Sequence, residues 1–216
     1  QPEIVADMNR QLVRLQQALR KPNLDSVLAL VAAVEAKDVY TQNHSLHVAV
    51  FAEQIALAAD LSAAQVELIR IAAILHDVGK IGIPDAILSK PGPLTPEELT
   101  VMRRHPSIGV TILQSLESVE AALPLILHHH EDFDGSGYPE GLAGEEIPLG
   151  ARVIRIADSL DAMTSPRVYK HALPLAVAIR EIEKGRATQF DPFIADISLA
   201  WLGRTRNPMA LLAQAT

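Results

Sequence analysis

The sequence contains no cysteine among its 216 residues, and only 4% of its side chains are aromatic. Without cysteine there are no disulfides, and the strong protein ligands left for a metal are histidine, aspartate and glutamate. Basic residues are outnumbered, with 19 Lys and Arg against 26 Asp and Glu, and no long basic run occurs. Because proteins that bind polymeric nucleic acid normally carry a basic surface, we expect no nucleic-acid polymer as a partner.

Long apolar runs and a signal peptide are also missing. No stretch approaches the roughly 20 apolar residues that span a bilayer, so we expect no membrane contact. The chain starts with Gln1 instead of Met. We therefore expect a cytoplasmic fragment of a longer protein.

The residues that are present favour helices. Ala, Leu, Ile and Val dominate, and strand-like alternation is nearly absent, so we predict an all-α fold, a compact bundle of many helices. The predicted helices cover residues 24–37, 41–59, 63–79, 96–104, 107–117, 119–130, 149–163, 174–184 and 192–202. Ser62 with Gln65 predicts a capping box, and Pro106 is expected in the first turn of a helix. The Gly- and Pro-rich segments 80–95 and 131–148 are predicted loops.

We predict two parts: an N-terminal helix over residues 1–23 and a main helical domain over residues 24–216. Apolar residues in the first part are spaced alternately by three and four positions: Val5, Met8, Leu12, Leu15 and Leu19. This short heptad pattern fits a coiled coil equally as well as an amphipathic helix packed on its own domain. A coiled coil there would relay signals from an upstream sensor or receiver domain and would support a homodimer.

Histidines and acids recur at inward positions. His44 falls in the middle of an apolar helical stripe, where a single histidine is most often a hydrogen-bonded core residue. His76 and Asp77 close an apolar segment, with Lys80 one turn later. Burying a carboxylate without a partner costs several kcal/mol, and a divalent cation removes that cost. The alternative is an ordinary ion pair at a helix end.

Three consecutive histidines, His128, His129 and His130, follow the next apolar run. On a helix, successive residues diverge by about 100°, so only two adjacent histidines can share a site, either 128/129 or 129/130. Further along, Asp158 and Asp161 share one helical face. Arg167, Tyr169 and Lys170 follow. The cations Arg167 and Lys170 would neutralise a phosphate, or they would belong to a solvated helix end.

Taken together, several helix ends carry inward histidine or aspartate, and His105 precedes a proline. This pattern predicts a metal site. The mixture of imidazole and carboxylate suits Fe, Mn, Zn, Ni or Co and is too rich in nitrogen for Ca or Mg alone. Because six or seven ligands exceed what one ion needs, we expect two divalent transition metals.

With these residues in view, the sequence resembles the HD-GYP family, a branch of the HD phosphohydrolase superfamily. The resemblance covers about residues 36–201. Its motifs are AKDVYTQNHSLHVA, ILHDVGKIGIPD, KPGPLTPEE, MRRHPSIG, HHHEDFDGSGYPEGLAGEEIP, RVIRIADSLDAMTS and TQFDP. The HD pair alone would be a weak signal, whereas the block that runs from the triple histidine to the Gly-Tyr-Pro sequence is specific.

The resemblance implies hydrolysis of cyclic di-GMP to linear pGpG, and further to GMP, through a hydroxide that bridges two metals, with Fe or Mn favoured. The metal ligands it implies are His44, His76, Asp77, His105, His129, His130 and Asp158, which selects the 129/130 pair. Asp77 would bridge the metals, and Lys80 would approach the scissile phosphate. Substrate-binding positions fall on Lys80, Asp161, Arg167 and Lys170, with Asp161 orienting Lys80 or a ligand.

The chain departs from the family pattern at several positions. Tyr40 stands where some members have a glutamate that recruits a third metal, so the resemblance implies two metals here. Asn43 replaces a usual glycine and His47 a usual arginine. Pro166, Val168 and Lys170 also differ. None of these differences removes an expected metal ligand.

Three alternatives remain open from the sequence. In the first, the chain acts on another cyclic nucleotide. In the second, it binds cyclic di-GMP or docks a protein without cleaving anything. In the third, it is a structural helical domain whose histidine cluster is incidental. For Tyr138 we favour a structural role in the loop over contact with a protein partner.

Overall fold

The computed structural model describes residues 29–35, 37, 43–165, 172–205 and 207–214. Within these ranges the secondary structure is helical, with one isolated bridge between Arg186 and Phe190 and no strand. The predicted all-α class is confirmed. No helix in the described ranges combines the length and the apolarity that a membrane crossing requires. The predicted N-terminal helix over residues 1–23, with its heptad pattern, lies outside the described residues.

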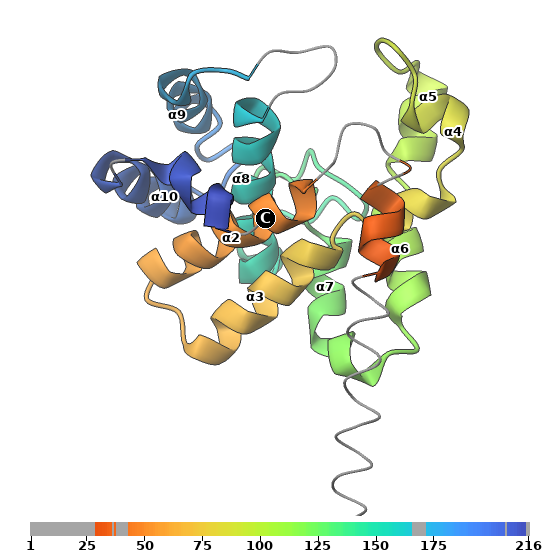
Figure 1. The fold of residues 1–216 in the computed structure, drawn as a ribbon, viewed down its shortest axis with the longest axis horizontal. Helices are drawn as coiled ribbons and strands as arrows, with labels where there is room; N and C mark the ends of the chain where they lie inside the picture. The colour runs from red at the N-terminus through yellow and green to blue at the C-terminus, as the bar shows by residue number, and fades with distance from the viewer. Residues whose placement is uncertain (1–28, 36, 38–42, 166–171, 206, 215–216) are drawn as a thin grey trace, which may run out of the picture.

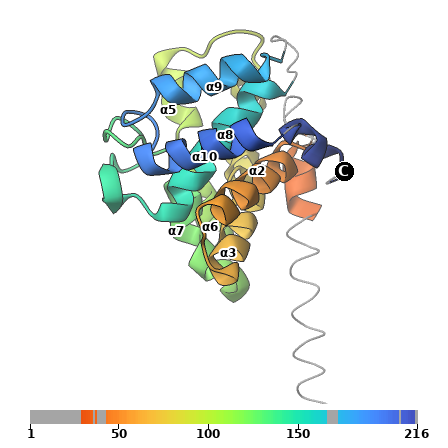
Figure 2. The same ribbon diagram turned by 90° about the vertical axis from the view of Figure 1, so that its left-hand side faces the viewer.

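Three helices form the centre of the fold: α2 (His44–Ala58), α3 (Ala63–Leu75) and α8 (Leu149–Thr164). α2 packs against both α3 and α8, as Figures 1 and 2 show. The predicted capping box is present, because the Ser62 side chain accepts the Gln65 N–H and Gln65 bonds back to Ser62. Fully buried apolar side chains such as Phe51, Ile55 and Ile154 fill the space between these helices and stabilise their packing.

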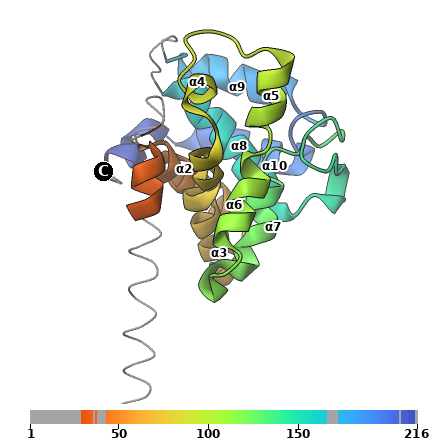
Figure 3. The same ribbon diagram turned by 90° about the vertical axis from the view of Figure 1, so that its right-hand side faces the viewer.

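A second group of elements follows α3: η1 (Val78–Gly82), α4 (Asp85–Leu88), α5 (Pro96–Met102), α6 (His105–Leu113), η2 (Glu117–Ala122) and α7 (Leu123–Leu127) (Figure 3). η1 and α6 touch backbone to backbone, since a Cβ on Gly79 would lie 1.9 Å from the His105 carbonyl oxygen. Only glycine permits this approach. The contact brings the segment after His76 and Asp77 next to His105.

The remaining elements are η3 (Gly144–Glu146), α9 (Leu175–Lys184), α10 (Pro192–Arg204) and η4 (Pro208–Gln214). α10 packs on α2, α8 and α9. Its N-cap, Asp191, accepts the N–H groups of Phe193 and Ile194 and pairs with Arg152 on α8. This buried carboxylate ties α10 to the central helices.

Two helices end earlier than the sequence predicted at points where histidines follow. α3 stops at Leu75 instead of residue 79, and α7 stops at Leu127 instead of residue 130. In both cases a histidine imidazole donates to the carbonyl three residues before it, His76 to Ala73 and His129 to Ile126. Those carbonyls would otherwise accept the next helical N–H, so the side chains compete with continued helix.

α6 also ends earlier than predicted, at Leu113 instead of residue 117. α6 begins at His105 instead of residue 107, with Pro106 in its first turn as predicted. The predicted loop 80–95 contains the short helix α4 and the end of η1. The predicted helix 24–37 is observed over the described residues 29–35 and 37.

Candidate metal centre

Side chains from distant parts of the chain converge beside the central helices. One set comprises Asp77, His105, His129 and His130, and a second comprises His44, His76 and Asp77. Within each set the ligand atoms lie within 4.8 Å of one another. Asp158 on α8 adjoins the second set, with its Oδ1 3.3 Å from His44 Nε2. All seven residues that the sequence nominated as ligands are therefore neighbours.

Asp77 lies between the two sets. Its Oδ1 is 3.3 Å from His105 Nε2, and its Oδ2 is 3.4 Å from His76 Nε2. The same Oδ2 is 3.7 Å from His44 Nε2 and 2.7 Å from Lys80 Nζ. Burial raises the pKa of Asp77, but the charge of Lys80 and the interactions with His76 and His105 outweigh it and hold the pKa well below its usual range. Asp77 is therefore a carboxylate at neutral pH.

Three imidazoles share one orientation. The Nδ1–H groups of His76, His105 and His129 donate to the carbonyls of residues 73, 102 and 126 at 2.7, 2.9 and 2.7 Å. Because a carbonyl can only accept, each ring carries its proton on Nδ1 and turns an Nε2 lone pair inward. This is the tautomer that binds a metal.

The inward nitrogens lack suitable protein partners. His105 Nε2 faces His129 Nε2 at 3.4 Å, so two lone pairs point at each other. His76 Nε2 is buried and has no hydrogen-bond partner. Buried acceptors without a donor are costly, and a cation between them removes the cost. The donor set therefore fits divalent metal ions.

Burial also sets the charge of these rings. It lowers the pKa of His105 to about 4 and the pKa of His129 and His130 well below the usual 6.5. Neutral imidazole is the form that coordinates metals. The four-residue set is therefore ready to bind a cation without first losing protons at neutral pH.

His44 differs from the other histidines because carboxylates surround it. Burial alone lowers its pKa, but hydrogen bonds with Asp158 and Asp161 outweigh burial and raise the pKa to about 10. Its Nδ1 is 2.6 Å from Asp161 Oδ2. Asp161 Oδ1 is also 3.0 Å from His47 Nδ1. Asp161 thus contacts both His44, a nominated ligand, and His47, which belongs to neither set.

The metal-free protein is expected to lose stability between about pH 6.5 and pH 5. His105, His129 and His130 stay neutral when folded, whereas in the unfolded chain they take up protons near 6.5. The unfolded state then binds more protons, so the unfolding free energy falls by on the order of 1 kcal/mol per pH unit for each ring.

His44 has the opposite effect on stability, and it acts at higher pH. Since the pKa of His44 is about 10 in the folded protein, its contribution to the unfolding free energy is complete below pH 6.5 and is lost as the pH rises toward 10. Denaturant unfolding of chelator-treated protein across this range measures both limbs. A stability that increased toward pH 5 would contradict the neutral imidazoles.

A family model described as HD domain matches residues 3–194, most of the chain. The chain belongs to the HD domain family. Curated relatives named cyclic di-GMP phosphodiesterases confirm the HD-GYP recognition made from the motifs.

Three relatives each match most of this HD domain. The "Cyclic di-GMP phosphodiesterase response regulator RpfG" of Xanthomonas campestris pv. campestris is 38% identical over 89% of this chain and 51% of its own length. "Cyclic di-GMP phosphodiesterase PA4108" of Pseudomonas aeruginosa is 45% identical over 81% and 41%. "3'3'-cGAMP-specific phosphodiesterase 2" of Vibrio cholerae is 35% identical over 87% and 36%. The chain thus spans about half or less of each relative.

A solved structure shares the fold. The crystal structure of a cyclic GMP-AMP specific phosphodiesterase from V. cholerae aligns with a TM-score of 0.65 over 86% of this chain and 50% of that one. Its sequence identity to this HD domain is 18%, so the likeness concerns the fold alone.

The triple histidine of this HD domain is divided between two environments. His129 and His130 join the four-residue set, while His128 faces Glu131 and Glu140. Only two adjacent histidines share the set, as the sequence predicted, but the three residues form a bend and turn after α7 and do not continue the helix. The turn lets His129 and His130 point into one site.

Glu131 is a structural residue that the sequence reading missed. It is buried, and its carboxylate accepts the N–H groups of Glu140 and Gly141. Asp132 pairs with Arg155 on α8. A charged run directly after a triple histidine was the available signal, because buried acids need such partners.

Tyr138 packs on a nominated ligand. Its ring stacks on His130 with centroids 4.8 Å apart and an angle of 26°, and its N–H donates to the His130 carbonyl. The Arg103 guanidinium carbon lies 5.2 Å from the centre of the Tyr138 ring, on the ring's face. These contacts support the structural role predicted for Tyr138.

Tyr138→Leu is expected to lower metal affinity by roughly tenfold, because residues that orient a metal ligand contribute effects of that size. Tyr138→Phe keeps the stacked ring and should keep the affinity. Competition with a metal-sensitive dye measures both variants. Equal affinities for Tyr138→Leu and Tyr138→Phe would show that stacking does not position His130.

Several nominated residues lie outside the described residues. These are the expected phosphate-binding residues Arg167 and Lys170, the altered positions Pro166 and Val168, and Tyr40.

Proposed function

We propose that this HD domain is a metal-dependent phosphodiesterase that hydrolyses cyclic di-GMP to linear pGpG and onward to GMP. The observation that carries the proposal is the pair of histidine sets that share Asp77. The names of the Xanthomonas and Pseudomonas relatives support the substrate.

We propose that two ions occupy the site, with His44, His76, Asp77 and Asp158 holding one and Asp77, His105, His129 and His130 holding the other. The mixed nitrogen and oxygen donors favour Fe or Mn, and they also accept Ni, Co or Zn. When bound, such ions supply positive charge next to a phosphate and lower the pKa of water enough for attack at neutral pH.

The chain's own residues would perform the remaining tasks. Lys80, whose Nζ already neutralises Asp77 at 2.7 Å, would also neutralise negative charge on a scissile phosphate. Asp161 would hold His44 in place through its 2.6 Å contact. Arg167 and Lys170 would grip the substrate phosphates, as the family resemblance implies.

A second substrate is supported by one observation. Relatives named 3'3'-cGAMP-specific phosphodiesterases match at up to 36% identity, close to the 38% of the Xanthomonas relative. Both molecules are cyclic dinucleotides with two phosphodiester bonds. Hydrolysis of 3'3'-cGAMP is therefore the alternative.

The test is a cleavage assay on anaerobically purified, metal-quantified protein supplied with each cyclic dinucleotide separately. Cyclic di-GMP should give linear pGpG first, and faster cleavage of 3'3'-cGAMP would favour the alternative. Ligand binding without any linear product, in fully metal-loaded protein, would show a binding module and contradict the proposal.

We also propose that the domain works in the cytoplasm and follows a sensor or receiver domain in the chain, with its N-terminal helix supporting a homodimer. The word "response regulator" in the name of the Xanthomonas relative supports the receiver. Light scattering of chains with and without residues 1–23 tests the dimer.

A further inference from the structure

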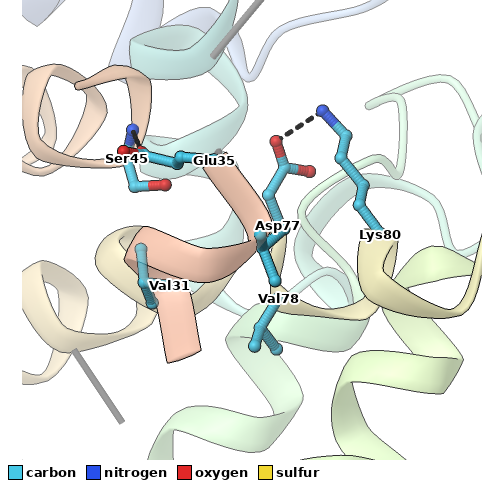
Figure 4. A pocket seen from close by; sticks show the side chains of 7 residues that line it. Val31, Glu35, Ser45, Asp77, Val78 and Lys80 are labelled. Carbon is cyan, nitrogen blue, oxygen red and sulfur yellow. Dashed lines mark hydrogen bonds and ion pairs between the residues drawn. The ribbon is translucent and has the colours of Figure 1, made fainter. Parts of the chain in front are cut away.

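The helical segment before α2 bonds to the start of α2 and to the end of η1, two elements that adjoin nominated ligands. It comprises residues 29–35 and 37, and its Val31 and Val34 are buried in the core. A small pocket separates it from the site and is lined by Val31, Val34, Glu35, Ser45, Asp77, Val78 and Lys80 (Figure 4). Glu35 and Lys37 reach from this segment to two different helix ends.

Glu35 caps the start of α2. The N-cap residue Asn43 has a φ of 63° and provides no side-chain cap. Instead, Glu35 Oε2 accepts the Asn43 N–H at 3.2 Å, and Glu35 Oε1 accepts the Ser45 N–H at 3.0 Å. These two amides flank His44, so one carboxylate fixes the backbone on both sides of a nominated ligand. A negative charge there also suits the helix dipole.

Lys37 caps the end of η1. Its Nζ donates to the carbonyls of Ile81 and Ile83 at 3.0 and 2.9 Å. Carbonyls at a helix end lack backbone partners, and a cation satisfies them. Its ion pair with Asp85 is solvent-exposed and contributes little. Asp77 is the N-cap of η1 and Lys80 lies within it, so Lys37 fixes the far end of the short helix that begins at the shared carboxylate.

We propose that Glu35 and Lys37 are positioning residues for the metal centre, with Glu35 placing His44 and Lys37 placing η1 together with its N-cap Asp77. The inference rests on the metal site of the proposed function. Since both residues lie on one helical segment, a shift of that segment changes both sides of the site together.

The experiment compares Glu35→Gln and Lys37→Met with a matched pair, Glu98→Gln and Lys90→Met. Glu98 also caps a helix, by accepting the Thr95 N–H, and it pairs with Lys90 at 2.6 Å. The helix it caps, α5, contributes no residue to either histidine set. Each variant is titrated with Mn²⁺ against a competing chelator, and the unfolding of its metal-free form is measured.

We expect all four variants to lose a similar, small amount of metal-free stability. Glu35→Gln and Lys37→Met alone should lower metal affinity, by roughly tenfold, as residues that position metal ligands do. Wild-type affinity in both variants would overturn the inference and leave the proposed function intact. An equal loss in all four variants would show a general effect of stability and would also overturn it. A wild-type protein that binds no divalent metal would overturn the proposed function, and this inference with it.

Discussion

Asp77→Asn is expected to slow cyclic di-GMP cleavage by roughly a thousandfold. Among the described residues, Asp77 is common to both histidine sets, with oxygens 3.3 Å from His105 Nε2 and 3.4 Å from His76 Nε2. An amide matches the carboxylate in shape but removes the negative charge between two cations. Metal assistance stabilises a transition state by several kcal/mol, and about 1.4 kcal/mol corresponds to a factor of ten in rate.

The measurement is turnover together with metal content per chain, and both should fall. Asp196→Asn serves as a control, since Asp196 pairs with Arg186 on the surface. Wild-type turnover and full metal content in Asp77→Asn would contradict the shared-carboxylate arrangement.

A second pair of variants keeps this test decisive if Asp77→Asn does not fold. His129 lies in the four-residue set, whereas its neighbour His128 faces Glu131 and Glu140. His129→Asn should therefore lose metal and activity, and His128→Asn should retain both. Identical behaviour of the two variants would contradict the division of the triple histidine.

Removing the metal with a chelator is expected to abolish cleavage and to destabilise the protein. A ligand that binds only the folded state, at about a hundredfold its Kd, stabilises that state by about 2.7 kcal/mol. We expect this stabilisation because a cation satisfies buried nitrogens that otherwise lack a donor. Without it, the lone pairs of His105 Nε2 and His129 Nε2 face each other at 3.4 Å, and His76 Nε2 has no partner.

Thermal unfolding with and without the chelator measures the effect, and added Mn²⁺ or Fe²⁺ should restore both stability and cleavage. The control is His129→Asn, whose melting temperature should respond less to metal. If the chelator left the melting curve unchanged, the result would favour a structural domain with an incidental histidine cluster.

Helix positions were readable from the sequence because they depend on local patterns. The capping box at Ser62 and the proline in the first turn of α6 are where the sequence indicated. The ends of α3 and α7 were not readable. They depend on the imidazoles of His76 and His129 bonding to backbone carbonyls, and the rotamers of buried rings are set by packing.

The residues of the metal centre were predicted from sequence motifs. The motifs nominated seven residues, and the structure brings all seven together. The supporting residues were harder to find. Glu35, Lys37 and Glu131 look like ordinary surface charges in the sequence, and their partners are backbone groups that the sequence does not distinguish.

By itself, the sequence determined the helical class, the family and the residues whose chemistry suits a metal, because apolar periodicity and side-chain type are written residue by residue. Only the tertiary structure decided which nitrogen of each ring faces inward, that Asp77 stands between two groups of histidines, and that Asp161 contacts His44 and His47. Those features depend on distances between segments far apart in the chain. Such distances are fixed when buried surfaces pack, as where Gly79 lets η1 touch the backbone of His105.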